Sequence, residues 1–301
     1  MELCSPEVES HDSDTAPAVA LADKANLSLE HYQCIEPQRS HGIPFRELWR
    51  YRELLYFLTW RDIKIRYKQT ALGAAWAILQ PLTTMLIFSL LFGRLAGMEN
   101  KTGGVPYPIY VFAGLLPWTF FSTALSNSGN SVVGSANLIT KVYFPRLIIP
   151  LASAGAGLVD LAISFGVLLV MMAYYKIAIT AQLLYLPLFL FGTILAATGV
   201  GTLLAALTVA YRDFRYVVPF MVQIWMFVTP VIYPSSIIPK QWQWAQALNP
   251  MAGLIDGFRA SFLGRPFEWG NILISFAVSI VLFFAGLSYF RSVERRFADI
   301  I

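Results

Sequence analysis

Six long apolar segments run through the 301-residue chain, with more polar stretches between them. They cover approximately residues 72–93, 108–132, 148–174, 183–210, 216–234 and 270–290. Each is close to the ~20 residues that an α-helix needs to cross the ~30 Å hydrocarbon core of a bilayer. The pattern therefore predicts an all-α polytopic membrane protein, with a six-helix transmembrane domain over residues 70–295.

Cationic side chains between these segments predict how the helices are oriented. One set lies in loops 134–147 and 211–215 and after the last segment, and consists of Lys141, Arg146, Arg212, Arg215, Arg291, Arg295 and Arg296. The opposite loops carry Arg94, Lys101, Lys176, Lys240, Arg259 and Arg265. A basic stretch before the first segment falls on the side of the first set. The positive-inside rule then places both termini, including residues 296–301, in the cytosol.

That basic stretch, residues 45–69, mixes cations with aromatic and aliphatic side chains. Its cations are Arg46, Arg50, Arg52, Arg61, Lys64, Arg66 and Lys68. The composition predicts an amphipathic helix in the membrane interface, with its cations near anionic lipid headgroups. Residues 63–68 also alternate with a period of two, so periodicity alone leaves the helical form of that end open.

The stretch between the fifth and sixth segments, residues 234–269, is too apolar for an ordinary loop, yet prolines interrupt it. Two short re-entrant helices in the outer interface fit it best, separated near Asn249 and Pro250. Asp256 and Arg259 are three residues apart on the second of these helices and can pair locally.

Amino-acid composition supports the membrane assignment and describes the N-terminal tail. The chain is 56% hydrophobic and 13% charged, whereas soluble domains carry ~25% charged residues. Residues 1–44 are acidic up to position 36 and are predicted to form a weakly ordered cytosolic tail. All histidines and cysteines of the chain lie in this tail. Their spacing matches no compact metal motif, so we expect no metal site.

Several longer motifs resemble the ABC-2 family of polysaccharide export permeases, which includes exporters of O-antigen, capsule and teichoic acid. Residues 59–82 read TWRDIKIRYKQTALGAAWAILQPL, and residues 137–152 read NLITKVYFPRLIIPLA. Further motifs of this family are FAGLLPWTFF (112–121), YRDFRYVVPFMVQIWMFVTPVIYP (211–234) and NPMAGLIDGFRASFLG (249–264). The resemblance covers about residues 45–295, in order. It implies a homodimer of six-helix subunits in the bacterial inner membrane, driven by two copies of a separate ATPase.

The energy source is expected on that other chain. The sequence contains no G-x-x-x-x-G-K-[ST] motif and no Gly-Lys dipeptide, so it lacks a P-loop that could cradle nucleotide phosphates. We expect a transport subunit with no catalytic residues and no cofactor of its own, ATP and Mg²⁺ on the partner ATPase, and no nucleic-acid partner. The resemblance implies that the substrate is a lipid-linked polysaccharide or polyol-phosphate polymer, moved outward past membrane lipid.

A coupling element for the ATPase is predicted in the short cytosolic loop before the third span. Its residues are Asn137, Lys141, Tyr143, Phe144, Pro145 and Arg146. The two aromatic residues would serve as buried anchors and the proline would stiffen the loop, and the resemblance implies that this loop docks on the ATPase. Arg61, Asp62, Lys64 and Arg66 of the interface helix would add a neighbouring contact. For the cations of both the loop and the helix, binding to lipid headgroups is the alternative.

The path for a glycan needs aromatic faces to stack on sugar C–H surfaces, and amides or hydroxyls to supply exchangeable hydrogen bonds. The candidates are Trp76, Gln80, Trp118, Phe121, Asn127, Gln223, Trp225, Phe227 and Tyr233. For each of them, contact with lipid or helix–helix packing is an equal alternative.

Three charged residues near or within the spans have two interpretations each. Arg212 and Arg215 could bind the pyrophosphate of a lipid-linked glycan, because arginine matches phosphate geometry; anchoring of the cytosolic end is the plainer account. Asp160 is the clearest carboxylate within a span. It would belong either to a proton relay or, as we prefer, to a buried structural pair, because no further ionisable groups stand at depth in the other spans.

Three rival functions follow from these residues. An integral membrane transferase would need an acid, base or metal cluster, which the spans lack in the sequence. An ion-coupled transporter would need partners for Asp160 in a relay. An ABC-2 permease for a drug or a simple lipid differs from the preferred interpretation only in its cargo.

Overall fold

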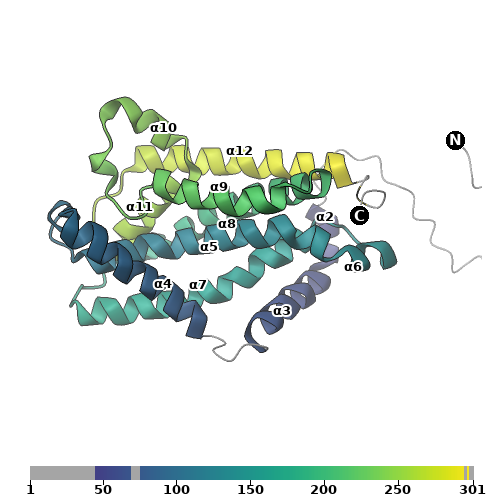
Figure 1. Cartoon of the computed structure of the whole chain (residues 1–301), viewed down its shortest axis with the longest axis horizontal. Coiled ribbons are helices and arrows are strands. Elements are labelled where there is room, and N and C mark those ends of the chain that lie inside the picture. The colour runs from purple at the N-terminus through teal and green to yellow at the C-terminus, as the bar shows by residue number, and fades with distance from the viewer. Residues whose placement is uncertain (1–44, 69–74, 295–296, 298–301) are drawn as a thin grey trace, which may run out of the picture. The chain divides into compact units, whose positions relative to one another are not determined.

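A computed structural model describes residues 45–68, 75–294 and 297. The predicted tail, residues 1–44, therefore lies outside the described residues, as do 69–74 and most of 296–301. Every regular element within the described ranges is a helix (Figure 1). Five helical stretches are long and apolar enough to cross a membrane: Ala75–Leu95, Tyr107–Gly134, Ile148–Tyr174, Ala181–Ala210 and Trp269–Glu294. The prediction of an all-α membrane protein is confirmed.

The elements follow the predicted segments closely. Their order is α2 (Phe45–Arg50), α3 (Arg52–Lys68), α4 (Ala75–Phe88), η1 (Ser89–Leu95), η2 (Met98–Lys101), α5 (Tyr107–Gly134), α6 (Ala136–Lys141), α7 (Ile148–Tyr174), η3 (Ala181–Tyr185), α8 (Leu186–Ala210), α9 (Phe214–Val228), η4 (Ser235–Ile237), η5 (Lys240–Trp242), α10 (Gln243–Ala247), α11 (Pro250–Leu263) and α12 (Trp269–Glu294).

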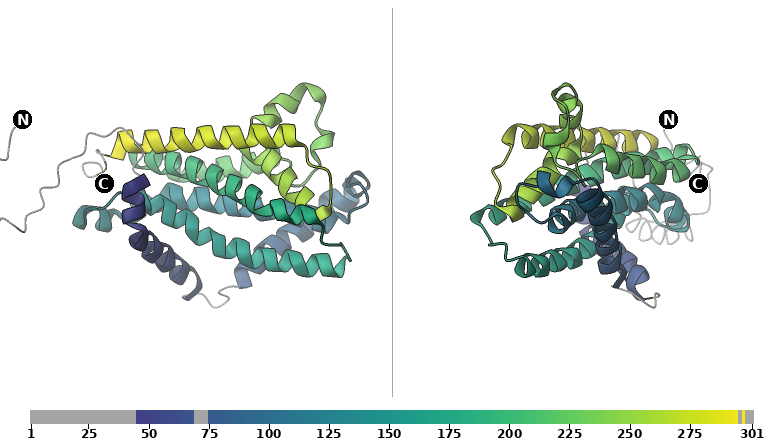
Figure 2. Two further views of the ribbon diagram at one scale, coloured as in Figure 1. Left: turned by 180° about the vertical axis from the view of Figure 1, so that it is seen from behind. Right: turned by 60° about the vertical axis from the view of Figure 1, so that its left-hand side comes forward.

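Helix α5 forms the centre of the bundle. It packs between α7 and α8, and α8 in turn packs against α12 (Figures 1 and 2). Side chains from Ile109 to Phe121 on α5 are almost all buried. Contact between α8 and α12 depends on Gly199, because a Cβ there would lie 2.6 Å from the backbone nitrogen of Phe283. The two ends of the bundle are distinct: α6 marks one and α11 marks the other (Figure 1).

The fifth apolar segment forms a shorter helix than predicted. Instead of one helix over 216–234, α9 ends at Val228 and spans 15 residues, or about 22 Å at ~1.5 Å per residue. The cause lies in the sequence Thr229-Pro230. Thr229 is extended, with ψ of 140°, because a residue before proline avoids the helical region. Pro230 therefore marks the end of this helix.

The stretch after α9 contains the two short helices that the prolines predict, α10 and α11, on either side of Asn249. The Asn249 side chain caps α11 by accepting a hydrogen bond of 3.1 Å from the backbone N–H of Met251. Pro250 occupies the first helical turn, where its missing N–H costs nothing. Gly264 ends the helix in the left-handed region, with φ of 64°. That these helices are re-entrant stays a prediction.

Candidate functional site

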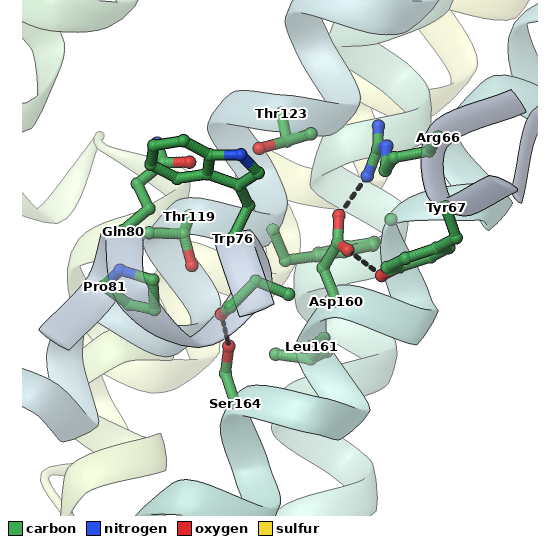
Figure 3. Close-up of a pocket in the computed structure, with 13 residues that line it drawn as sticks. Arg66, Tyr67, Trp76, Gln80, Pro81, Thr119, Thr123, Asp160, Leu161 and Ser164 are labelled. Carbon is green, nitrogen blue, oxygen red and sulfur yellow. Dashed lines mark hydrogen bonds and ion pairs between the residues drawn. The ribbon is translucent and has the colours of Figure 1, made fainter. Parts of the chain in front are cut away.

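A cavity of about 260 Å³ opens where α3, α4, α5 and α7 meet (Figure 3). Arg66 and Tyr67 reach it from the last turn of α3, and Trp76, Gln80 and Pro81 line it from α4. The remaining lining residues are Ala77, Thr119, Phe120, Thr123, Gly157, Asp160, Leu161 and Ser164. The cavity joins the interface helix to three of the long apolar helices, so it is the strongest candidate site among the described residues.

Asp160 is the charged centre of this cavity. One of its carboxylate oxygens accepts a hydrogen bond from the Arg66 guanidinium, with which it forms an ion pair, and the other accepts from the Tyr67 hydroxyl (Figure 3). Burial, the hydrogen bond to Asp160 and the negative charge of Asp160 raise the pKa of the Tyr67 phenol. The carboxylate at the middle of α7 is thus paired, as expected, and its partners come from α3.

Two of the predicted path residues, Trp76 and Gln80, stand side by side on the cavity wall facing Thr119 and Thr123 (Figure 3). Three others pack elsewhere: the Phe121 ring lies 5.6 Å from Trp118 and 5.2 Å from Trp225, edge to face in the latter case. The Trp225 indole N–H also donates to the Asn249 side chain over 3.2 Å. Within a single chain, these three aromatic residues serve packing, and their place in a path stays a prediction.

Three of the four remaining path candidates lie on or near α9. Gln223 and Phe227 are exposed on this helix, beside other exposed apolar side chains. The Tyr233 hydroxyl donates to the Phe227 carbonyl over 3.0 Å, which closes the turn after α9. Asn127 is half-buried on α5. Whether these four contact a substrate stays a prediction.

The predicted coupling loop surrounds α6 and the turn into α7. Its two aromatic anchors differ: Phe144 is buried in this chain's own core, beside Leu147, Ile148 and Phe290, whereas Tyr143 is 73% exposed. Arg146 is held to the end of α12, because its backbone N–H donates to the Glu294 carboxylate over 3.0 Å and its guanidinium donates to the Glu294 carbonyl. Asn137 and Lys141 are exposed, and Pro145 is half-buried. Tyr143 is therefore the aromatic side chain that this loop offers to a partner.

The cations of the interface helix separate into two groups. Arg61 and Lys64 stay at the surface: Arg61 pairs with Asp62 at 2.9 Å, and Lys64 lies 5.6 Å from the Trp60 ring centre. Asp62 also accepts a 3.3 Å hydrogen bond from Ser153 on α7. Arg66 instead reaches the cavity and Asp160, so its coupling role has no support in its position. Arg212 and Arg215 are both exposed at the turn between α8 and α9, at the α6 end of the bundle (Figure 1).

Arg259 is the residue whose importance the sequence did not reveal. The expected pair with Asp256 forms at 3.4 Å, but it is the longest of its polar contacts. The buried guanidinium donates to the Pro230 carbonyl over 2.7 Å, to the Val231 carbonyl, and to the Tyr110 carbonyl and hydroxyl over 3.2 and 3.1 Å. Arg259 thereby connects α11, α5 and the turn that ends α9. Its acceptors are mostly backbone carbonyls, which leave no signal in a sequence.

Comparison with known proteins identifies the family. The profile of the ABC-2 type transporter family matches residues 53–263, which contain the cavity, the α6 loop and Arg259. The chain belongs to the ABC-2 type transporter family. This ABC-2 chain is 33% identical over 259 residues to the O-antigen export system permease protein RfbA of Myxococcus xanthus, covering 85% of the chain and 98% of the relative.

Two further relatives extend the comparison of this ABC-2 transporter. The polysialic acid transport protein KpsM of Escherichia coli is 26% identical, covering 78% of the chain and 91% of the relative. The inner membrane transport permease YadH of Escherichia coli strain K12 is 24% identical, covering 62% of the chain and 75% of the relative. Together with its apolar helices, this membership makes the chain an integral membrane protein.

Proposed function

We propose that the chain is the permease subunit of an ATP-driven exporter that moves a lipid-linked polysaccharide, such as O-antigen, out of the cytosol across the bacterial inner membrane. Two copies would form the path, and two copies of a separate ABC ATPase would supply energy from ATP and Mg²⁺. The observation that carries this proposal is the likeness to RfbA, which extends over 98% of that export permease.

The proposed topology has six spans and both termini in the cytosol. The fifth of these spans would be α9, which at 15 residues would need the turn through Pro230 and Tyr233 or local thinning of the bilayer to reach across. The α6 end of the bundle would be cytosolic, because it carries Lys141, Arg212 and Arg215. The exposed apolar side chains of α4 and α9 would face lipid or the second copy.

Polysaccharide is favoured over a drug or a simple lipid as the cargo. The relatives with polysaccharide names are more similar and cover more of the chain than YadH, whose name specifies no cargo. An ion-coupled mechanism is disfavoured because both oxygens of Asp160 accept hydrogen bonds from Arg66 and Tyr67. A carboxylate held in this way is a poor proton carrier.

The direct test is capture of the ATPase. The tagged chain would be purified in mild detergent from its native membrane, and the proteins that accompany it would be identified by mass spectrometry and assayed for ATP hydrolysis. We expect one stoichiometric partner with a Walker A motif. Tyr143→Ala should lower its recovery about tenfold or more, as loss of a central aromatic contact does in other interfaces. Tyr174→Ala, equally exposed at the other end of the bundle, is the matched control.

A preparation that is pure, folded and free of any ATPase would contradict the proposal and favour the transferase or ion-coupled alternatives. Capture of an ATPase that is equally strong in Tyr143→Ala would retain the exporter but exclude this residue from docking. In cells, deletion of the captured ATPase should stop surface display of the glycan, and unchanged display would contradict the cargo assignment.

A further inference from the structure

The cavity beside Asp160 lies deep in the bundle. Asp160 is the thirteenth of the 27 residues of α7, or about 18 Å along the helix from its start at ~1.5 Å per residue. Polar and charged groups at such depth are costly and normally face protein or water. An ion pair alone would explain Arg66 and Asp160, but it would not explain an adjoining open space lined by an amide, two threonines and an exposed indole.

Several hydrogen-bond acceptors lie on the wall of this cavity. The Thr119 hydroxyl donates its proton to the Leu116 carbonyl over 3.0 Å, and the Ser164 hydroxyl donates to the Ala77 carbonyl over 3.2 Å. Both oxygens therefore present lone pairs. The Asp160 carboxylate offers about four acceptor positions, of which Arg66 and Tyr67 occupy one on each oxygen. Two positions remain for a ligand.

These acceptors distinguish between ligand chemistries. A phosphate brings negatively charged oxygens that only accept hydrogen bonds. In this cavity it would be repelled by the Asp160 carboxylate, because the neighbouring Arg66 is already paired with that carboxylate. A neutral sugar brings several O–H donors, which match the free acceptor positions. Its apolar C–H surface also needs an aromatic face, and Trp76, which is 55% exposed in the single chain, lines the cavity. Gln80, beside Trp76 in Figure 3, supplies both a donor and an acceptor.

We propose that this cavity is a carbohydrate subsite that binds one neutral sugar residue. Trp76 would stack on the ring, Asp160 and Gln80 would hydrogen-bond its hydroxyls, and Arg66 and Tyr67 would be positioning residues that orient the carboxylate. The volume of about 260 Å³ lies below the ~300–1,000 Å³ of pockets for drug-sized ligands, so it suits one ring rather than a chain. The inference rests on the proposed glycan export and assigns a recognition point to it.

Protection of a cysteine in the cavity tests the proposal. The full chain, with Cys4→Ser and Cys34→Ser and the reporter Thr123→Cys, would be placed in lipid nanodiscs and labelled with a small methanethiosulfonate. Octyl glucoside below its micelle concentration is the probe, and octyl phosphate is the chain-matched anion. Labelling should slow about fivefold at a glucoside concentration about four times its Kd, as 1 + [L]/Kd requires. Octyl phosphate should change the rate less than about twofold at the same concentration.

Matched tryptophan variants show where the sugar binds. Trp76→Ala should abolish the protection, whereas Trp244→Ala, 64% exposed on α10, should retain it. Native mass spectrometry of bound glucoside gives a second readout that does not depend on the reporter. Equal protection by octyl phosphate, protection that survives Trp76→Ala, or no glucoside binding by either readout would each overturn the carbohydrate assignment. ATPase capture and glycan display would be unaffected by that failure, so the exporter proposal would stand or fall separately.

Discussion

Two arginines of this protein each pair with an aspartate, in opposite surroundings. Arg259 is 2% exposed, and its guanidinium lies 4.1 Å from the centre of the Tyr110 ring while donating to three backbone carbonyls. Arg66 keeps 30% of its side chain exposed, and its partner Asp160 keeps 28%. The cavity adjoins Arg66 and Asp160, whereas Arg259 is not among the residues that line it.

The difference separates a structural ion from a recognition group. Around Arg259 two of the acceptors are the Pro230 and Val231 carbonyls, which the end of α9 leaves free, and a buried carbonyl without a partner is costly. The arginine satisfies them and fixes the turn. Around Arg66 and Asp160, by contrast, acceptor positions remain open and face a space that a ligand can enter. Exposure alone does not distinguish the two, but the open acceptor positions of Asp160 beside the cavity do.

Arg259→Met should give the largest effect of any change at either site. It keeps an apolar stem but leaves Asp256 and the carbonyls of Pro230 and Val231 without their donor. Removing one partner of a buried pair costs about 3–5 kcal/mol, so we expect little folded protein in the membrane. Fluorescence-detected size-exclusion chromatography would measure this. Arg215→Met, at an exposed site, is the control, and a monodisperse Arg259→Met protein of normal yield would refute the structural role.

Gly114→Ala tests the same site without removing a charge. A Cβ at this position would collide with the Arg259 guanidinium and lie 2.7 Å from the Val231 carbonyl oxygen. Overpacking of this kind costs about 1–3 kcal/mol, so thermal unfolding in detergent should begin several degrees lower. Gly134→Ala is the matched control, because its Cβ meets nothing within 4 Å. Equal unfolding temperatures for the two variants would mean that the approach of Arg259 to α5 is not tight.

Asp160→Asn should lower stability only slightly but should weaken sugar binding strongly. The pair with Arg66 is partly solvated, so its loss should cost about 1 kcal/mol or less. Sugar binding should suffer more, because hydrogen bonds to a charged acceptor contribute about 1.5–3 kcal/mol, or about tenfold or more in affinity. Glucoside protection of the cavity reporter and thermal unfolding, measured on one preparation, give both values. If Asp160→Asn strongly lowers the unfolding temperature but leaves glucoside binding normal, the distinction between the two arginines is wrong.

The sequence predicted the fold better than it predicted these two sites. Run length and proline positions were enough for five of the long helices, and the Asn249-Pro250 break was visible in the same way. The end of α9 was missed although Thr229-Pro230 encodes it, because the apolar run continues to Tyr233. Partners 94 residues apart, such as Arg66 and Asp160, have no local pattern. The carbonyl acceptors of Arg259 have no side-chain identity at all, so only coordinates reveal them.

The smallest expected effect near neutral pH is a pH dependence at Asp256, beside Arg259. Burial is the main cause that raises the pKa of this carboxyl from 3.8 to about 6, and Glu268 raises it further; Arg259 and the Ser235 hydroxyl act in the opposite direction. The Asp256 carboxyl therefore holds its proton more tightly in the folded protein than in the unfolded chain. As a result, stability falls as pH rises from about 4 to about 6. From pH 6 to 7.5 the further loss is only about 0.4 kcal/mol. Asp256 keeps 20% of its side chain exposed, which makes this an upper value.

Thermal unfolding at pH 4.5, 6.0 and 7.5 measures that slope. Asp256→Asn should remove it, because the amide does not titrate, whereas Asp213→Asn at the exposed turn before α9 should leave it in place. A flat profile in the parent protein would mean that Arg259 compensates Asp256 fully despite the 3.4 Å separation. Asp256 would then be an ionised carboxylate paired with Arg259, as Asp160 is with Arg66. The two arginines would still differ in their contacts with the backbone, which only Arg259 makes among the hydrogen bonds described above.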